Sequence, residues 1–459
     1  MTIPTILNEL QAHLEQSLER NKAVGASLAV LFNNKVYTAA AGKININTGV
    51  DVTEDAVFQI GSATKVFTAT LVMQLAGQGR LTLDDPVKKY LPEFKIADPT
   101  ASANVTIRHL LSHTSGIDGD FFEEADYGRE KLMRFLDKCT LLPQAFPMGK
   151  GFSYCNAGWI ILGRMVEVIT GRTWEENMIE NIFNPLGMDH AVVHPGDTLK
   201  FRSAIGHIKN PETGKFMPSP HPYLMLSNAP AGATTTMRAK DLITFARMHF
   251  DNGKAPGGKQ VLQEKSVKEM QTAQVTLPPR ASENYSRWGL GWAMIDYEKA
   301  TVIGHDGTTF GQHAYFRTVP EKKFAVALLT NCDHGGKVYK ELFPELFSQL
   351  LGVDMNAAAA PNPPAQIDLD RYIGRYETIA AGFDVFAEDG ALFGTMTAKT
   401  LPEEVSPPET YALAPADKDC FLMTCLADPE NKDYISFLGN TEDGHPESLF
   451  LGLRMMIRS

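Results

Sequence analysis

The sequence predicts an α/β fold: an antiparallel sheet flanked by helices, an inserted all-helical lobe, and a small C-terminal antiparallel β-domain. Three observations support it. Strand-like runs lie near both ends of residues 1–352, with a helical pattern between them. A stretch rich in alanine and proline follows, and short alternating apolar runs separated by turn residues fill the remainder. One sheet assembled from distant segments, with a separate β-domain behind it, fits this order.

The N-terminal region is expected to form a helix and a hairpin. Apolar residues recur at helical spacing over residues 4–20, which predicts an amphipathic helix. Residues 26–32 and 35–41 are strand-like and are joined by Asn33 and Asn34, a residue type that tolerates the positive φ of tight hairpin turns. We expect this hairpin to open the sheet.

The middle of the chain, over about residues 80–285, predicts the helical lobe. Its clearest helices are expected at residues 107–112, 157–169 and 241–250. Runs rich in β-branched and aromatic residues then return at residues 290–295, 300–304, 313–319 and 324–330, and a helix is expected at residues 337–351. These strands are expected to complete the sheet that the N-terminal hairpin opens.

The chain is therefore expected to divide into three parts. Residues 1–352 would form one domain, residues 353–366 a linker, and residues 367–459 a β-barrel or β-sandwich. The linker contains the run from Ala357 to Pro364, in which alanine and proline show no periodicity and seldom build a core.

Composition argues against several classes of partner. The chain has 459 residues, a net charge of −11 and no long basic run, so nucleic acid and anionic membranes are poor partners. Residues 1–21 lack the continuous apolar core of a signal peptide, and no later run predicts a membrane span. We expect a cytoplasmic protein, unless an export signal was removed, and the sequence leaves the oligomeric state open. A small molecule or short peptide is the partner that these exclusions leave for the motifs below to test.

Cysteine and histidine spacings do not predict a metal site. The five cysteines are odd in number and lack paired zinc-ligand spacing. Free buried thiols are the expectation, with a Cys420–Cys425 disulfide as the alternative. His109 and His113 have a spacing that can bind zinc on a helix, but the adjacent glutamate of such motifs is missing, so a structural role is expected. We expect neither a metal nor a cofactor.

The stretch from Gly61 to Lys65 opens an apolar helix that runs to Leu75. A helix places Ser62 and Lys65 on one face, with the amine within reach of the hydroxyl. The helix N-terminus adds backbone N–H groups and a field that favours negative charge. Alone, such a serine is more often an N-cap and such a lysine a solvated side chain, so a nucleophilic Ser62 depends on the remaining motifs.

Two later segments supply further candidate residues, Tyr154-Cys155-Asn156 and His305-Asp306-Gly307-Thr308. Acyl transfer needs a nucleophile, a proton acceptor, an acid and donors aimed at the oxyanion. Lys65 or Tyr154 could accept the proton of Ser62 if burial and a neighbouring charge lower its pKa.

Asn156 supplies an amide for Lys65 and for a substrate carbonyl, and the backbone N–H groups of Ser62 and Thr308 are candidate oxyanion donors. Taken singly, Tyr154 is more often a packed aromatic, Asn156 a helix cap and His305 a structural residue.

The three segments, in this order, resemble those of the serine β-lactamase-related hydrolases, which include class C β-lactamases, DD-carboxypeptidases, D-aminopeptidases and β-lactamase-fold esterases. Further stretches within residues 5–352 are similar to signatures of this family, namely Leu81 to Pro92, Thr106 to Ile117, Tyr154 to Gly158, Asn184 to Met188 and Gly304 to Gly307. Tyr372 to Tyr376 resembles the opening of a β-domain that some members carry at the C-terminus.

The resemblance implies a β-lactamase/DD-peptidase-like fold and a role for each matching residue. Ser62 would be the acylated nucleophile, Lys65 its activating partner and Tyr154 the proton shuttle. The substrate-binding residues would be Asn156, His305, Gly307 and Thr308, with His305 at the position of a β-lactamase lysine and Thr308 completing the oxyanion hole.

The third segment departs from the β-lactamase pattern. His305 carries only a conditional charge near neutral pH, and Asp306 opposes a substrate anion. We therefore expect a serine hydrolase that cleaves an amide, such as a small or linear peptide in the manner of D-aminopeptidases, or an ester, through an acyl-enzyme at Ser62. One alternative is a carboxylesterase with weak β-lactamase activity. An alternative of another class is a non-catalytic binding or sensor protein of the same fold.

Overall fold

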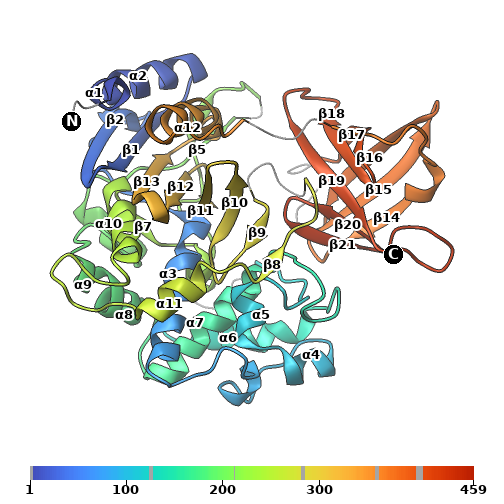
Figure 1. Cartoon of the computed structure of the whole chain (residues 1–459), viewed down its shortest axis with the longest axis horizontal. Coiled ribbons are helices and arrows are strands. Elements are labelled where there is room, and N and C mark those ends of the chain that lie inside the picture. Colours follow the sequence, from blue (N-terminus) through green and yellow to red (C-terminus); the bar gives the residue numbers. More distant parts are fainter. Residues whose placement is uncertain (1–3, 123–127, 211, 281–284, 357–360, 400–406) are drawn as a thin grey trace.

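The computed structural model describes residues 4–459 except 123–127, 211, 281–284, 357–360 and 400–406. A larger body holds the chain up to its longest helix, and a separate β-barrel follows (Figure 1). Residues 357–360 of the expected linker lie outside the described residues.

The larger body is built on a nine-stranded sheet. Its spatial order is β3 (Val50–Asp51), β2 (Lys35–Asn45), β1 (Gly25–Phe32), β13 (Phe324–Thr330), β12 (His313–Val319), β11 (Ala300–Thr308), β10 (Ala293–Tyr297), β9 (Arg287–Trp288) and β8 (Val275–Thr276). Antiparallel pairing of β1 with β13 joins segments from opposite ends of this body. The prediction of one sheet assembled from distant segments is confirmed.

The N-terminal hairpin is also confirmed. Strands β1 and β2 pair along their length, with Phe32 opposite Lys35. Asn33 and Asn34 have φ values of 49° and 63°, the left-handed conformation that a two-residue hairpin turn requires. The expected helix over residues 4–20 is divided at Glu9 into α1 (Thr5–Asn8) and α2 (Leu10–Asn21).

Each face of the sheet packs against its own set of helices. Leu28 and Val30 of β1 face a core shared with α2 and α12 (Gly335–Leu351). Ala29 and Leu31, the alternate residues, face the core that contains α3 (Thr64–Gly77) and α10 (Ala239–Phe250). Because successive strand residues point to opposite faces, β1 is apolar throughout.

Helix α3 lies at the centre of this body, which explains why its sequence is apolar on nearly all sides. Eleven of its residues are buried, Lys65 among them. The lobe around it contains α4 (Pro99–Asn104), α5 (Ile107–Leu111), α6 (Lys131–Lys138), α7 (Asn156–Thr170), α8 (Trp174–Met178), α9 (Asn184–Leu186) and α11 (Glu264–Met270). Short strands accompany the helices, in the pairs β4 (Phe58–Gln59) with β7 (Thr236–Met237) and β5 (His207–Lys209) with β6 (Phe216–Pro218).

The C-terminal β-domain is a closed barrel. Its strands are β14 (Gly374–Glu377), β15 (Ala381–Glu388), β16 (Ala391–Ala398), β17 (Glu409–Asp417), β18 (Cys420–Cys425), β19 (Lys432–Leu438), β20 (Ser448–Leu451) and β21 (Arg454–Arg458). Pairing of β14 with β21 closes the ring, which decides between the two expected architectures in favour of the barrel and removes the exposed sheet edges.

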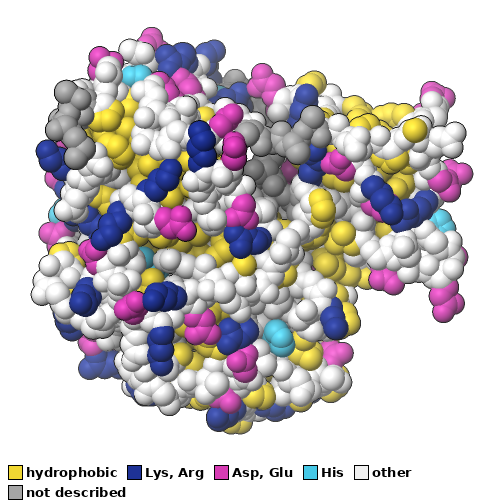
Figure 2. All heavy atoms as spheres, in the orientation of Figure 1, with side chains coloured by type: hydrophobic (Ala, Val, Ile, Leu, Met, Phe, Trp, Pro, Cys, Tyr) yellow, Lys and Arg dark blue, Asp and Glu magenta, His cyan; other side chains and the backbone are white. Residues whose placement is uncertain are grey.

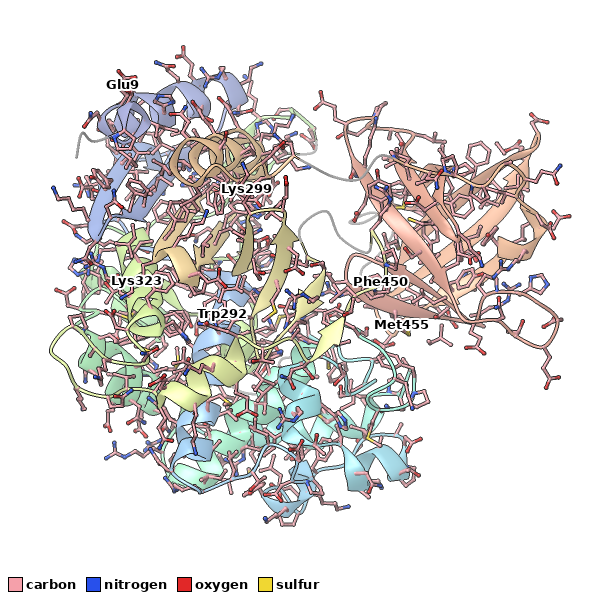
Figure 3. The ribbon with its side chains drawn as sticks, in the orientation of Figure 1. Glu9, Trp292, Lys299, Lys323, Phe450 and Met455 are labelled. Atoms are coloured by element: carbon pink, nitrogen blue, oxygen red, sulfur yellow. The ribbon has the colours of Figure 1, made fainter. Side chains whose placement is uncertain are left out.

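An apolar cluster joins the barrel to the larger body. It combines Phe152, Tyr154 and Trp288 with Phe450 of the barrel, and Leu453 and Met455 pack against it. Phe450 and Met455 lie on the side of the barrel that faces β8 and β9 (Figure 3). Hydrophobic side chains gather at this junction on the molecular surface as well (Figure 2).

The cysteines are free and buried, including Cys420 and Cys425, for which the disulfide alternative is therefore wrong. Within the part of the chain that the structure describes, no helix has the length and apolar character needed to cross a membrane.

Candidate active site

A cleft of about 340 Å³ opens where the sheet, the helical lobe and the barrel meet. The structure brings six of the seven residues expected at the site to its lining: Ser62, Tyr154, Asn156, His305, Gly307 and Thr308. The seventh, Lys65, is fully buried beside Ser62. Of two tryptophans that lie four residues apart in the sequence, Trp288 lines the cleft, whereas Trp292 packs in the core against Phe245 and Phe316.

A tight approach of two chain segments positions Ser62. The serine lies in a 3₁₀ turn, Gly61–Ala63, that leads into α3. Gly61 has a φ of 50°, and a Cβ there would lie 2.4 Å from the backbone nitrogen of Thr308. A Cβ on Gly307 would lie 1.8 Å from the carbonyl oxygen of Ile60. Glycine is therefore required at both positions for β11 to lie against the Ser62 turn.

Lys65 lies within hydrogen-bond distance of Ser62. Its Nζ lies 2.9 Å from Oγ of Ser62 and donates a hydrogen bond to the carbonyl oxygen of Ala231 at 2.5 Å. Burial lowers the pKa of Lys65 well below its usual value, and the charge of Arg454 lowers it further, while Asp120 opposes the shift. The buried amine therefore favours its neutral form, which has a lone pair available for a proton.

Tyr154 contacts both Ser62 and the barrel. A hydrogen bond joins its hydroxyl to that of Ser62, and Nζ of Lys65 lies 4.9 Å from the centre of its ring. Burial raises the pKa of Tyr154 well above that of a free tyrosine, so its hydroxyl keeps its proton at neutral pH. Of the two proton acceptors left open by the sequence, these opposite shifts favour Lys65.

His113 packs against the ring of Tyr154. Its ring stacks on that of Tyr154 with the centres 4.2 Å apart, and its Nδ1 accepts a hydrogen bond from the backbone N–H of Cys155 at 2.9 Å. Its backbone φ is 57°. This agrees with the expected structural role of His113, although its contact with Tyr154 had no signal in the sequence beyond the family-like segment that contains it.

Asn156 starts α7 and donates from Nδ2 to Asp120 at 2.7 Å. We expected this amide to hold Lys65, whereas the lysine bonds to Ser62 and Ala231. Asp120 in turn accepts a hydrogen bond from Nε of Arg454 at 2.6 Å. Sequence reasoning missed both charged residues, because neither belongs to a motif and Arg454 comes from the barrel.

His305 is a hydrogen-bond acceptor rather than a cation. Its Nδ1 lies 2.6 Å from the carbonyl oxygen of Asp306, which can only accept, so Nδ1 carries the proton. Its Nε2 is buried and has no hydrogen-bond partner within the described residues. Burial lowers the pKa of His305 to about 3, and the neighbouring Lys65 lowers it too. The expectation of a conditional charge near neutral pH is thereby corrected.

Asp306 does not present a free negative charge to the cleft. Its carboxylate forms a two-pronged ion pair with Arg317, whose Nη2 lies 2.9 Å from Oδ2, and it accepts a hydrogen bond from the hydroxyl of Tyr285 at 2.6 Å. The expectation that Asp306 opposes a substrate anion overlooked these partners, which lie on β12 and near β9.

The arrangement is similar to that of several known proteins. Penicillin-binding protein 4 of Amycolatopsis lactamdurans is 40% identical over 356 residues, which cover 77% of this chain and 93% of that protein. The structure of SurE, also solved with D-Leu, is 28% identical with a TM-score of 0.82 and covers 99% of both chains, barrel included. A D-stereospecific amidohydrolase from Streptomyces sp. is 25% identical with a TM-score of 0.59, covering 74% of this chain and 99% of that one.

A family model described as Beta-lactamase matches residues 10–350, which span the sheet, the lobe and each motif residue of the cleft. Members of this family include penicillin-binding proteins and amidases, which are serine hydrolases. The chain belongs to the β-lactamase family.

Proposed function

We propose that this protein is a serine hydrolase that cleaves an amide bond through an acyl-enzyme at Ser62. One observation carries the proposal: a fully buried lysine amine, with a lowered pKa, lies 2.9 Å from the hydroxyl of a serine that lines a cleft. A lysine in that state serves as a general base at neutral pH. A binding protein would have no need for this costly burial of an ionisable amine.

The residues of the cleft suffice for both half-reactions. Lys65 takes the proton from Ser62 as Oγ attacks the substrate carbonyl, and the backbone N–H groups of Ser62 and Thr308 stabilise the oxyanion. The hydroxyl of Tyr154 protonates the departing amine and is reprotonated from Lys65. A water molecule then attacks the acyl-enzyme ester and gives its proton to Lys65. Lys65 passes that proton to Oγ of Ser62 as the serine leaves, which restores the free site.

The lining of the cleft suggests the chemistry of the substrate. Nε2 of His305 is an acceptor without a partner among the described residues, which favours a substrate with an N–H donor nearby. Phe122, Leu224 and Leu453 add apolar surface to the lining. An amino-acid amide or short peptide with an apolar side chain fits both features. The similarity to SurE bound to D-Leu and to a D-stereospecific amidohydrolase favours a D residue.

Covalent labelling tests the enzyme class. A fluorophosphonate should form an adduct on Ser62, identified by mass spectrometry of the digested protein, and the Ser62→Ala variant should remain unlabelled. The same substitution should abolish turnover of every substrate. An unlabelled wild-type protein, checked as folded by its thermal melt, would contradict the proposal and favour a binding protein of the same fold.

A substrate panel tests the bond and the configuration. We expect kcat/KM to be highest for apolar D-aminoacyl amides or peptides, lower for their L counterparts, and lowest for a chromogenic cephalosporin. Rapid cephalosporin turnover would contradict the interpretation of His305 as a neutral acceptor. Preference for p-nitrophenyl esters with no amide turnover would favour the carboxylesterase alternative.

A further inference from the structure

The hairpin between β20 and β21 pairs with the segment that carries Tyr154. The carbonyl oxygen of Leu453 accepts a hydrogen bond from the backbone N–H of Tyr154 at 2.8 Å. The backbone N–H of Met455 donates to Oγ of Ser153 at 3.1 Å. The barrel therefore bonds to the backbone N–H of Tyr154, the proposed proton shuttle, and to the side chain of the residue before it.

Further contacts fix the position of this hairpin. Phe450 is fully buried within the apolar cluster that contains Phe152 and Trp288. Elsewhere in the junction, the backbone N–H of Ile379 donates to Asp118 at 2.5 Å. A buried apolar contact combined with directional hydrogen bonds specifies a single docking geometry for the barrel.

Arg454 extends from this hairpin into the cleft. Its Nε donates to Asp120 at 2.6 Å and its Nη1 to the carbonyl oxygen of Gly452 at 2.8 Å. Its guanidinium carbon lies 4.8 Å from the centre of the Tyr154 ring, a distance at which a cation is attracted by the ring face. Asp120 uses its other oxygen to accept from Asn156. One barrel side chain thus connects to two residues of the candidate active site.

We propose that the C-terminal barrel is part of the catalytic site, in which Arg454 is a positioning residue that fixes Asn156 through Asp120 and holds a positive charge against Tyr154. This inference rests on the proposed hydrolase function. It extends that function by making the two bodies of the chain a single catalytic unit.

The charges around Lys65 give the inference a distinctive signature. The positive charge of Arg454 lowers the pKa of Lys65, and the negative charge of Asp120 raises it. Among the described residues, further titratable neighbours of Lys65 are His113, His305, Tyr154 and Cys155, and their shifted pKa values keep each of them neutral at pH 7. Removing the charge of Arg454 should therefore raise the pKa of Lys65, and removing the charge of Asp120 should lower it.

The pH dependence of Ser62 labelling measures this protonation without knowledge of the natural substrate. The full-length protein is mixed with a fluorophosphonate between pH 5 and 9, and the second-order rate constant is fitted at each pH. The acid limb of the pH profile is the range in which labelling slows because Lys65 becomes protonated. In Arg454→Gln the acid limb should move to higher pH, so that labelling at pH 6 is roughly three- to tenfold slower than in the wild type. In Asp120→Asn the limb should move to lower pH.

Two matched variants complete the experiment. Arg454→Lys keeps the charge and should keep the wild-type limb. Arg458→Gln removes an arginine of the same strand that bonds instead to Tyr376 and Ile373 within the barrel, and it should also leave the limb in place. A thermal melt of each variant shows that it is folded.

The outcomes separate the two proposals. Opposite shifts in Arg454→Gln and Asp120→Asn support the inference. Labelling that slows equally at every pH in both variants would assign Arg454 a purely structural role and overturn it, while leaving the hydrolase proposal intact. Absence of labelling in the wild type would overturn the hydrolase proposal and, with it, this inference.

Discussion

Two aspartate–arginine pairs flank the cleft, and they differ in how the fold encloses them. Asp306 and Arg317 lie on neighbouring strands of one sheet, and the side chain of Arg317 is 0% exposed while that of Asp306 is 27% exposed. Asp120 and Arg454 join the lobe to the barrel, with side chains 16% and 32% exposed. The first pair belongs to one body, and the second spans two.

The difference separates a structural ion pair from a connecting one. Arg317 is enclosed by Asp306 and by the hydroxyl of Tyr339, 3.1 Å away, so its charge has no access to water. Arg454 stays partly hydrated and lines the cleft. Breaking an enclosed ion pair lowers the free energy of unfolding by several kcal/mol, as a rule, whereas breaking a partly exposed pair lowers it little. A partly exposed pair at a cleft can instead act on the groups that line the cleft.

The largest expected effect is on the enclosed pair. Arg317→Met should lower the free energy of unfolding by about 3–5 kcal/mol, because it leaves the Asp306 carboxylate without its partner. Urea denaturation at pH 7 measures this. Adding Asp306→Asn should recover more than half of the loss, since the uncompensated charge is then gone. A double variant no more stable than the single one would show that Arg317 acts through packing instead.

A second effect concerns Asp118, beside the connecting pair. Burial raises the pKa of Asp118 to about 6 from the unfolded value of 3.8. Between these values the folded state binds more protons than the unfolded state, so the free energy of unfolding falls as pH rises from 3.8 to 6. Asp118→Asn should therefore be more stable than the wild type by up to about 3 kcal/mol at pH 7, the full difference that the two pKa values imply. The side-chain oxygen of the asparagine can still accept the hydrogen bond from the backbone N–H of Ile379.

The control for Asp118 is the same comparison at acid pH. Near pH 2.5, well below both pKa values, the carboxyl is almost fully protonated in both states, so wild type and variant should have equal stability. A gain of the same size at both pH values would mean that charge is not its origin.

The connecting pair itself should contribute little stability. Arg454→Met is expected to lower the free energy of unfolding by at most about 1 kcal/mol, as for other partly exposed pairs. The measurement is the urea denaturation used for Arg317→Met. Equal losses in the two variants would remove the distinction between the enclosed and the connecting pair.

The smallest expected effect is at His305, on the side of the enclosed pair. Because the pKa of His305 is lowered to about 3, the residue is neutral across the pH range of activity. His305→Gln, which exchanges one neutral acceptor for another, should leave the acid limb of Ser62 labelling unchanged even where the rate falls. A displaced limb would show that the imidazole of His305 titrates within the pH range of the labelling experiment.

Much of the fold was predictable because its signals are local. The hairpin at Asn33 and Asn34, the strands at residues 313–319 and 324–330, and the apolar helix after Ser62 follow from turn chemistry and from apolar periodicity over a few residues. The kink at Glu9 and the choice of a barrel over a sandwich were not predictable, since strand closure depends on pairing between the ends of the domain.

The candidate site divides in the same way. Ser62 and Lys65 are three residues apart on one helical turn, so their contact is encoded locally. The protonation state of His305 depends on burial, which no short segment specifies. Asp306 meets Arg317 only through strand register.

By itself, the sequence determined the family, the order of the elements and the pairing of Ser62, the proposed nucleophile, with the amine of Lys65. Only the tertiary structure decided which charges surround them: Arg317 neutralises Asp306, and Arg454 reaches Asp120 and Tyr154 from another domain. The physical reason is that motifs record contacts within one turn or one strand. The electrostatics of a buried site, by contrast, depends on every charge within several ångströms, whatever its distance along the chain.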